Sequence, residues 1–307
     1  MVHYIQKKTG MINTERLSLR LLNNTDPEFI LELVNMPEWI RFIGDRNVHS
    51  TEDAQNYIQN ALLDTTSQYW IVSLKEDKIP IGLITFMKRS YLLHFDIGFA
   101  FLTQYTNLGY AYEAVNAVVE TILSDPSHEK IAAILLPENK KSIRLLQRLG
   151  LRFETEIKKK EQVLHLYSVP TDYLKINRLT SRFFNLFTNT NQQTPPLDDL
   201  YSICLQKAII AKKEIDRTEI YDLEEFLNPR KKILTDGTLT EFREYEVSEE
   251  TRISNNLAQR ISRYHKDGYL NGVYFSENGT KLFQFTNDEN TWKIASVIWE
   301  DSTSPLS

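Results

Sequence analysis

The sequence predicts a mixed α/β (α+β) domain, in which helices flank a mixed β-sheet, followed by an α+β domain with a curved antiparallel sheet. Three observations lead to this fold class. Residues 97–114 form the pattern of an alternating apolar strand, a short loop and a helix. Residues 252–299 are rich in strands separated by turn residues. The length of 307 residues exceeds one ordinary domain, so two domains are expected.

Composition and charge disfavour several classes of function. The formal net charge is −5, from 36 basic and 41 acidic residues, which speaks against nucleic acid as a partner. No apolar run approaches the roughly 20 residues that span a bilayer, and residues 1–10 are polar rather than signal-like. The single cysteine, Cys204, precludes an intrachain disulfide and fits a reducing compartment. We therefore expect a cytoplasmic protein without a membrane partner.

The first domain is predicted over residues 1–172. Residues 16–20 alternate as a strand does, and Asp26 with Pro27 indicates the start of a helix over residues 27–34. Ser50 or Thr51 caps a helix that ends near residue 63. The later elements follow in order as strands 70–74, 80–87 and about 91–102, helix 110–124, a buried strand 131–136, helix 140–149 and a last strand 164–169.

The second domain is predicted over residues 173–307. It begins with an amphipathic stretch, residues 179–187, and a polar loop closed by prolines, residues 188–196. Two short helical patterns precede a sheet with strands at residues 252–261, 270–275, 280–286 and 292–299. Turns are expected at residues 266–268 and 277–279, where Asp-Gly and Asn-Gly occur.

Two motifs in the first domain carry chemistry. A helix that opens after a short loop offers unpaired N–H groups and a positive dipole end, which suit a phosphate. Some thirty residues later Asn139 and Ser142 stand at another helix start, and Gly150 and Phe153 follow it. Together the motifs resemble the GNAT acetyltransferases, and within them the branch of the ribosomal-protein alanine N-acetyltransferases.

The resemblance implies acetyl-CoA as acyl donor, with its diphosphate on residues 106–111. Gly109 and Ala111 match the small residues of the family's phosphate loop, while Thr106 replaces the usual Gln or Arg. Asn107 stands where many relatives carry glycine, and Asn tolerates the positive φ required there. The cofactor-binding residues implied are Ala100, Phe101, Leu102, Thr106, Asn107, Leu108, Gly109, Tyr110, Ala111, Asn139 and Ser142.

By the same resemblance, the Asn139 amide reaches the cofactor and Ser142 protonates the departing thiolate. The alternative is that both residues only cap a helix, which their side chains would do anyway. For the proton of the amine, the period of two places His94 and Asp96 on the polar face of their strand, toward the acceptor. Asp96 is the candidate base and His94 a candidate substrate contact. The alternative is a salt bridge from Asp96 to Lys88 or Arg89.

Glu38 and Trp39 lie in a connection that covers the acceptor side in this family, where an acidic group would attract a protonated amine. Trp39 could equally be packed beneath that connection. No cluster of His, Cys or Asp has metal-ligand spacing, so no metal is expected.

The order of elements in the second domain, with residues 292–299 at its end, resembles the NTF2-like or SnoaL-like cone fold. That resemblance implies a hollow beneath the sheet, a binding or pairing role and a possible homodimer. The candidate cavity residues are Tyr221, Phe226, Arg260, Tyr264 and Trp299. The alternative is that the aromatic residues among them belong to the hydrophobic core, which is the usual place for aromatic residues at alternating strand positions.

The sequence therefore predicts an acetyl-CoA-dependent N-acetyltransferase. Branch resemblance favours a protein or peptide N-terminal α-amine as the acceptor. Two alternatives stay open: acetylation of a small amine such as an aminoglycoside or polyamine, and a non-catalytic acyl-CoA sensor.

Overall fold

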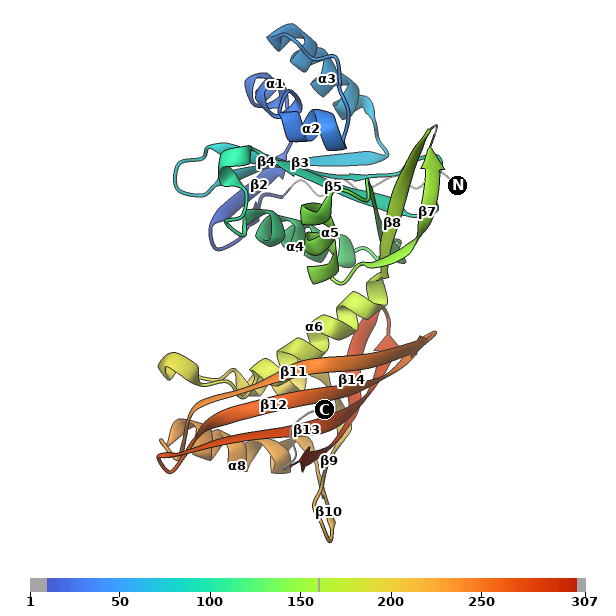
Figure 1. Cartoon of the computed structure of the whole chain (residues 1–307). Coiled ribbons are helices and arrows are strands. Elements are labelled where there is room, and N and C mark those ends of the chain that lie inside the picture. Colours follow the sequence, from blue (N-terminus) through green and yellow to red (C-terminus); the bar gives the residue numbers. More distant parts are fainter. Residues whose placement is uncertain (1–9, 160, 303–307) are drawn as a thin grey trace. The chain divides into compact units, whose positions relative to one another are not determined.

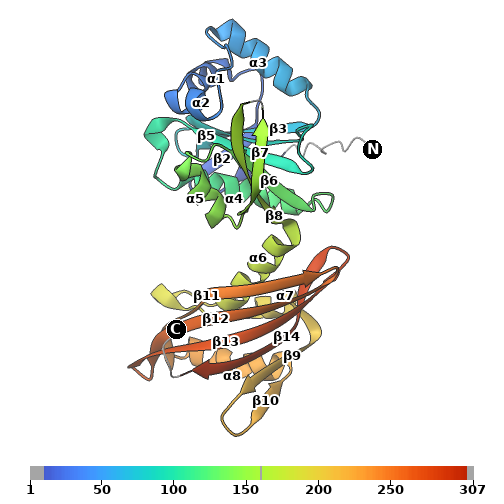
Figure 2. The same ribbon diagram turned by 45° about the vertical axis from the view of Figure 1, so that its right-hand side comes forward.

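The structure is a computed structural model that describes residues 10–159 and 161–302. It divides into two compact units, Met1–Thr171 and Asp172–Ser307 (Figures 1 and 2). Residues 1–9 lie outside the described residues, and they form most of the polar segment that does not resemble a signal peptide. Within the described ranges, no helix is both long and apolar enough to cross a membrane.

The first unit is built on an eight-stranded sheet in the order β1-β2-β3-β4-β5-β6-β8-β7. Helices α1 to α3 lie on one side of this sheet, and α4 and α5 lie on the other (Figure 1). The elements are β1 (Ile12–Asn13), β2 (Leu17–Leu21), α1 (Pro27–Val34), α2 (Pro37–Phe42), α3 (Thr51–Leu63), β3 (Ser67–Leu74), β4 (Pro80–Met87), β5 (Phe95–Phe101), η1 (Thr103–Tyr105), α4 (Tyr110–Leu123), β6 (Lys130–Leu135), α5 (Lys140–Arg148), β7 (Arg152–Lys159) and β8 (Gln162–Pro170).

Local sequence signals account for the helix starts of this unit. Ser50 caps α3 by accepting a hydrogen bond from the Asp53 N–H, as its position predicts. Pro27 occupies the first turn of α1, where its missing N–H costs nothing. The predicted strands and helices are present, and the structure adds β1, α2 and β7, which are not among the predicted elements.

The sheet is antiparallel throughout except between β5 and β6, which run parallel. Their pairing covers only Phe95 with Ile131 and Asp96 with Ala132. Within the described sheet, no pairing to β6 continues along the rest of β5, so the two strands separate after Asp96. The separation leaves one edge of β5 open in the middle of the sheet, and we call this opening the fork.

The second unit contains a six-stranded sheet in the order β10-β9-β14-β13-β12-β11. Only the β14–β9 pair is parallel in this sheet. The elements are α6 (Thr171–Asn185), η2 (Thr190–Gln192), η3 (Leu197–Asp199), α7 (Leu200–Ile203), β9 (Cys204–Lys213), β10 (Thr218–Tyr221), α8 (Leu223–Thr235), β11 (Leu239–Ser254), β12 (Leu257–Leu270), β13 (Val273–Asp288) and β14 (Thr291–Ser302).

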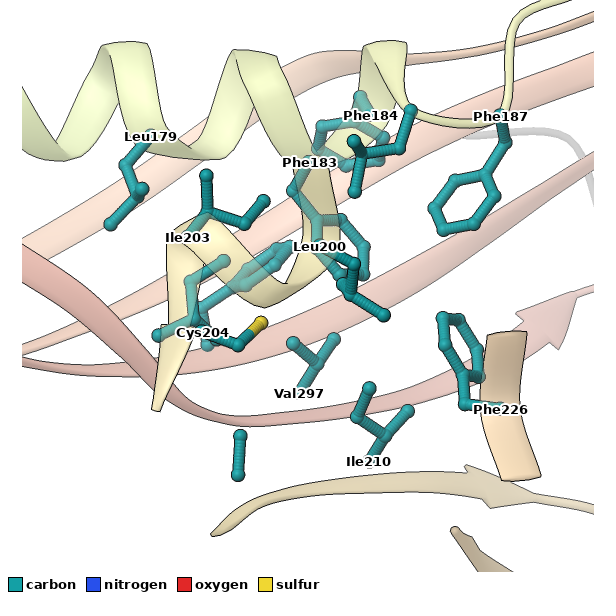
Figure 3. Packing of buried hydrophobic residues seen from close by; sticks show 14 of the residues in the cluster. Leu179, Phe183, Phe184, Phe187, Leu200, Ile203, Cys204, Ile210, Phe226 and Val297 are labelled. Carbon is teal, nitrogen blue, oxygen red and sulfur yellow. The ribbon is translucent and has the colours of Figure 1, made fainter. Parts of the chain in front are cut away.

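The core of this unit lies between the sheet and its helices. Figure 3 shows Phe183 and Phe184 of α6, and Phe187 just after that helix, pointing toward Phe226 of α8 and Val297 of β14. Ring pairs such as Phe187 with Phe226, with centroids 5.7 Å apart, add aromatic contact to this apolar burial. An amphipathic helix and a sheet face are therefore joined through one continuous core.

The predicted turns at residues 266–268 and 277–279 are wrong, because both segments lie inside long strands. A Cβ at Gly268 would stand 3.0 Å from the Phe242 backbone, and one at Gly279 would stand 2.4 Å from the Tyr264 ring. These glycines permit close approach between neighbouring strands. The true turns follow Ser254, Leu270 and Asp288, where asparagines and Gly272 take positive φ.

Cys204 begins strand β9, where it is buried. Burial raises the pKa of its thiol to about 12, which makes it unreactive at neutral pH.

The candidate cavity residues of the second unit are engaged with one another or with charged partners. Arg260 is 1% exposed and its Nε donates to Glu246 at 2.9 Å, while the Tyr264 hydroxyl donates to Asp301 at 2.6 Å. The rings of Phe226 and Trp299 lie 5.7 Å apart, and those of Tyr221 and Phe226 lie 6.3 Å apart.

Candidate active site

The segment between β5 and α4 has the backbone geometry of an anion-binding loop. Asn107 has φ +62°, as its side chain allows, and Gly109 has φ +84° as the N-cap of α4. In residues 10–159 and 161–302, none of the backbone N–H groups from Asn107 to Tyr112 donates a hydrogen bond. Six unpaired donors of one short segment therefore lie beside the positive end of the α4 dipole.

Thr106, the departure from the family motif, does not present its hydroxyl to this loop. Its Oγ1 donates instead to the Thr103 carbonyl at 2.9 Å and closes the short helix η1. Thr106 therefore does not make the side-chain contact to the loop's ligand that Gln or Arg would make at this position.

Arg16 supplies a cation to the same loop from the start of β2. Its Nη1 donates to the Leu108 carbonyl at 3.0 Å, and its guanidinium lies over the Tyr110 ring at 4.5 Å. Glu113, in the first turn of α4, holds Arg16 through an ion pair of 2.6 Å. Arg16 therefore fixes the loop from outside and leaves its N–H groups free.

Glu113 also ties the chain before β2 to the start of α4. It accepts hydrogen bonds from the Thr14 hydroxyl at 2.5 Å and from the Arg16 N–H at 2.9 Å. Partial burial opposes ionisation, but these hydrogen bonds and the charge of Arg16 hold the pKa of Glu113 below its ordinary value. The Arg16–Glu113 pair was not predicted from the sequence. The signals for it were a cation beside a predicted strand and an acidic residue in the first turn of a predicted helix, and neither identifies the other as its partner.

Asp96 lies at the fork between β5 and β6 and is 2% exposed. Its Oδ2 accepts a hydrogen bond from Arg89 Nε at 2.6 Å, which is the salt bridge considered as an alternative from the sequence. Its Oδ1 accepts the Ile134 N–H at 3.0 Å, beyond the point where the strands separate. Burial raises the pKa of Asp96, although the charge of Arg89 acts in the opposite direction.

His94 lies just before β5 and is partly buried. Burial and the charges of Lys130 and Lys88 lower the pKa of its imidazole. The ring is therefore neutral at pH 7 and able to accept a hydrogen bond.

Asn139 and Ser142 lie together at the start of α5. Asn139 is the N-cap, and its Oδ1 accepts the Ser142 N–H at 3.2 Å. Neither the Nδ2 of Asn139 nor the hydroxyl of Ser142 has a hydrogen-bonding partner within the described part of the chain. Asn139 therefore does cap the helix, as the alternative interpretation expected. Its Nδ2 and the Ser142 hydroxyl nevertheless remain available to a ligand.

Glu38 and Trp39 lie on the short helix α2, which adjoins the end of β5. The Thr103 hydroxyl donates to Glu38 Oε2 at 3.4 Å, and Trp39 belongs to the same apolar cluster as Leu102. Trp39 is 5% exposed, and its indole N–H finds no partner in the described residues.

Of the remaining predicted cofactor residues, Ala100 and Phe101 end β5 and Leu102 follows it. The Phe101 ring packs on Gly82 of β4, where an added Cβ would stand 2.5 Å from it. Beyond Asp96, the opposite edge of β5 pairs with no strand among the described residues. The Leu102 N–H donates to the Ile81 carbonyl, and the Leu102 carbonyl accepts from the Tyr105 N–H. Across the described residues, no group of three or more His, Cys, Asp and Glu side chains is arranged to hold a metal ion.

Comparison with known proteins gives the class of this domain. The family described as acetyltransferase (GNAT) domain matches residues 16–152. The uncharacterized N-acetyltransferase YnaD of Bacillus subtilis (strain 168) is 30% identical over 148 residues, which cover 48% of this chain and 86% of that protein.

Solved structures with similarity to this chain include two enzymes with different acceptors. Ribosomal-protein-S5-alanine acetyltransferase from Vibrio fischeri has 20% identity and a TM-score of 0.47, with 53% of this chain and 97% of that chain covered. Spermidine N-acetyltransferase from Vibrio cholerae, in complex with CoA and spermine, has 18% identity and a TM-score of 0.46, with 52% and 99% covered.

The chain belongs to the GNAT acetyltransferase family. It is an N-acetyltransferase, an enzyme that moves an acyl group to an amine, and the matched domain lies within the first structural unit.

Proposed function

We propose that this enzyme transfers the acetyl group of acetyl-CoA to the α-amine at the N-terminus of a protein or peptide. The observation that carries the proposal is the set of free N–H groups from Asn107 to Tyr112 beside the Arg16 cation. Acetyl-CoA carries a diphosphate that suits such donors and a thioester that supplies the acetyl group. Gly109 also accommodates this cation, because a Cβ there would stand 3.2 Å from Arg16 Nη2.

The open edge of β5 at the fork and the start of α5 are the proposed binding surfaces for the rest of the donor. The Leu102 N–H and carbonyl are bonded to Ile81 and Tyr105, so the proposed contacts to an extended amide chain come from the open edge of β5 before Leu102. The Nδ2 of Asn139 offers another hydrogen bond. Holding the amine against the thioester accounts for up to about 7–11 kcal/mol of the barrier. Much of the rate is therefore available from positioning.

We keep Asp96 as the proposed acceptor of the amine proton, a role suggested by its position in the sequence. Its hydrogen bonds support a second role, which is to position the strands around the fork. Both of its oxygens already accept hydrogen bonds, from Arg89 and Ile134. A carboxylate engaged in this way positions the strands around the fork. His94 and Glu38 are proposed contacts of the acceptor amine, and Trp39 is proposed to line the same side. The amine nitrogen forms a bond to the acetyl carbon and gives its proton to Asp96, while the C–S bond breaks and Ser142 protonates the departing thiolate.

Ser142→Ala tests the proposed acid. The Ser142 hydroxyl has no partner among described residues, so its loss leaves the α5 cap intact. If the hydroxyl protonates the leaving thiolate, we expect kcat to fall about 10²-fold or more while the Kd for acetyl-CoA changes little. The measurement is steady-state kinetics with calorimetric titration of CoA. An unchanged kcat would leave Ser142 as part of the helix start only.

The second unit is proposed to be an NTF2-like or SnoaL-like domain with a binding or pairing role, through which two copies of the chain associate as a homodimer. The supporting observation is its curved sheet packed against α6 and α8 around one core. A cytoplasmic location is proposed on the single, buried cysteine.

The experiment that tests the function measures CoA release from acetyl-CoA in the presence of three acceptor classes: peptides with free N-termini, polyamines and aminoglycosides. We expect release with peptides and a mass increase at the peptide N-terminus. Release with polyamines or aminoglycosides alone would replace the proposed acceptor by a small amine. Binding of acetyl-CoA without turnover of any amine would instead indicate the sensor role.

A further inference from the structure

A basic cavity of about 490 Å³ lies at the end of α5. Arg144, Gln147 and Arg148 of α5 line it, together with Arg152 at the start of β7. We call it the arginine pocket. Its volume is within the range of about 300–1,000 Å³ that small-molecule sites occupy.

The three arginines of this pocket carry positive charge without acidic neighbours. Among residues 10–159 and 161–302, no ion pair involves Arg144, Arg148 or Arg152. By contrast, Arg16, Arg20 and Arg89 in the same unit each have a carboxylate within 2.6 Å. In a chain of net charge −5, three unneutralised guanidiniums around one cavity point to an anionic occupant.

Part of this arrangement has a purely structural explanation. A cation in the last turn of α5, such as Arg148, stabilises the helix through its dipole. It does not account for Arg144, which lies in the middle of α5. Arg152 comes from a different element, but it also serves the end of α5, since its Nη1 donates to the Gln147 carbonyl at 3.1 Å. This hydrogen bond holds the Arg152 guanidinium at the wall of the pocket.

The arginine pocket adjoins the start of α4. The Arg148 guanidinium lies over the Tyr112 ring, 4.3 Å from its centroid. Tyr112 belongs to the first turn of α4, three residues after Gly109. At a rise of about 1.5 Å per residue, that turn is within about 5 Å of the free N–H groups along the helix axis. An anion in the pocket is therefore a near neighbour of an anion on the loop.

We propose that the arginine pocket binds the 3′-phosphate of the nucleotide end of CoA and thereby selects CoA over dephospho-CoA. This inference rests on the proposed function, because it requires the CoA diphosphate on the loop before α4. CoA carries a second phosphate group, a monoester on the ribose, at a short distance from its diphosphate. Planar guanidiniums bind such a group through paired hydrogen bonds. Arg144 lines the pocket, and its guanidinium has no hydrogen-bonding partner among the residues that the structure describes.

The test is calorimetric titration of the full chain with CoA and with dephospho-CoA at the same ionic strength. We expect CoA to bind about 10- to 100-fold more tightly, the effect of one or two hydrogen bonds between charged groups. Arg144→Gln and the double variant Arg144→Gln with Arg152→Gln should weaken CoA binding toward the level of dephospho-CoA. Their affinity for dephospho-CoA should stay at the wild-type value.

Lys141→Gln is the matched control, because it removes a cation from the same helix that does not line the pocket. It should retain the preference for CoA. Arg144→Lys should keep part of it. Arg148 is left unchanged because it packs on Tyr112. Circular dichroism and thermal melting identify any variant that fails to fold.

Equal binding of CoA and dephospho-CoA by the wild type would overturn this inference and leave the proposed function intact. The inference would also be overturned, again without affecting the proposed function, if the Arg144→Gln and double variants kept the wild-type preference for CoA over dephospho-CoA. Failure of both ligands to bind the wild type would instead overturn the phosphate loop, and with it the proposed function.

Discussion

Replacement of Gly109 by valine is expected to weaken acetyl-CoA binding by about 100-fold or more. Gly109 has φ +84°, which costs an L-residue about 1–2 kcal/mol and a β-branched one more. The new Cβ would also stand 3.2 Å from Arg16 Nη2, so the cation that fixes the loop would have to move. Calorimetric titration with CoA measures the effect.

Gly237→Val is the matched control for this substitution. Gly237 has nearly the same backbone angle, φ +87°, and a Cβ there would meet nothing within 4 Å. It lies between α8 and β11 in the second unit. The control should suffer a comparable backbone strain and keep full affinity for CoA. Unchanged affinity in Gly109→Val would show that the diphosphate does not lie on this loop.

Asp96→Ala is expected to lower the stability of the first unit by about 2–4 kcal/mol. The substitution leaves the Arg89 guanidinium, 29% exposed, without its carboxylate and leaves the Ile134 N–H without an acceptor. Hydrogen exchange of peptides from β5 and β6 measures the effect locally, and urea denaturation measures it globally. Exchange at Ile134 should accelerate most. Unchanged exchange and stability would contradict the account of the fork.

Asp96→Asn separates the two partners of this carboxylate. The amide oxygen still accepts from Ile134 but offers no charge to Arg89, so we expect a smaller loss than in Asp96→Ala. Because burial raises the Asp96 pKa, the folded protein takes up this proton at a higher pH than the unfolded chain does. The contribution of Asp96 protonation to folding stability is therefore complete below the ordinary Asp pKa of about 3.9. It is lost as the pH rises through the pKa of Asp96 in the folded protein.

The stability of the wild type relative to Asp96→Asn should accordingly increase as pH falls from about 7. A decrease on acidification would mean that the attraction to Arg89 outweighs burial. The pH profile of kcat for the same variant tests the proposed base, since loss of the acidic limb would follow from removal of a titrating proton acceptor.

The local order of the first unit could be predicted from periodicity and helix-start residues. The strand that ends near Leu102, the loop with Asn107 and Gly109 at positive φ, and the cap at Asn139 depend on neighbouring residues in the chain. Such features are set by backbone sterics and side-chain reach, which a sequence displays directly.

Features that depend on distant contacts could not be predicted. Arg16 reaches Leu108 only because β2 lies beside the start of α4, 92 residues later in the chain. Gly268 and Gly279 suggested turns, yet each accommodates a neighbouring strand or ring. A glycine indicates either freedom of φ or lack of a Cβ, and only the folded partner decides between the two.

The fork depends on the reach of a single side chain. In an ordinary parallel ladder, the Ile134 N–H would donate to a backbone carbonyl of the adjacent strand; here it donates to a carboxylate from β5. Asp96 thus lets the two strands lie apart while the Ile134 N–H still has a hydrogen-bond acceptor. The reach of the Asp96 side chain is part of what holds the strands at this separation, so Asp96→Glu, one methylene longer, would alter the spacing of the fork.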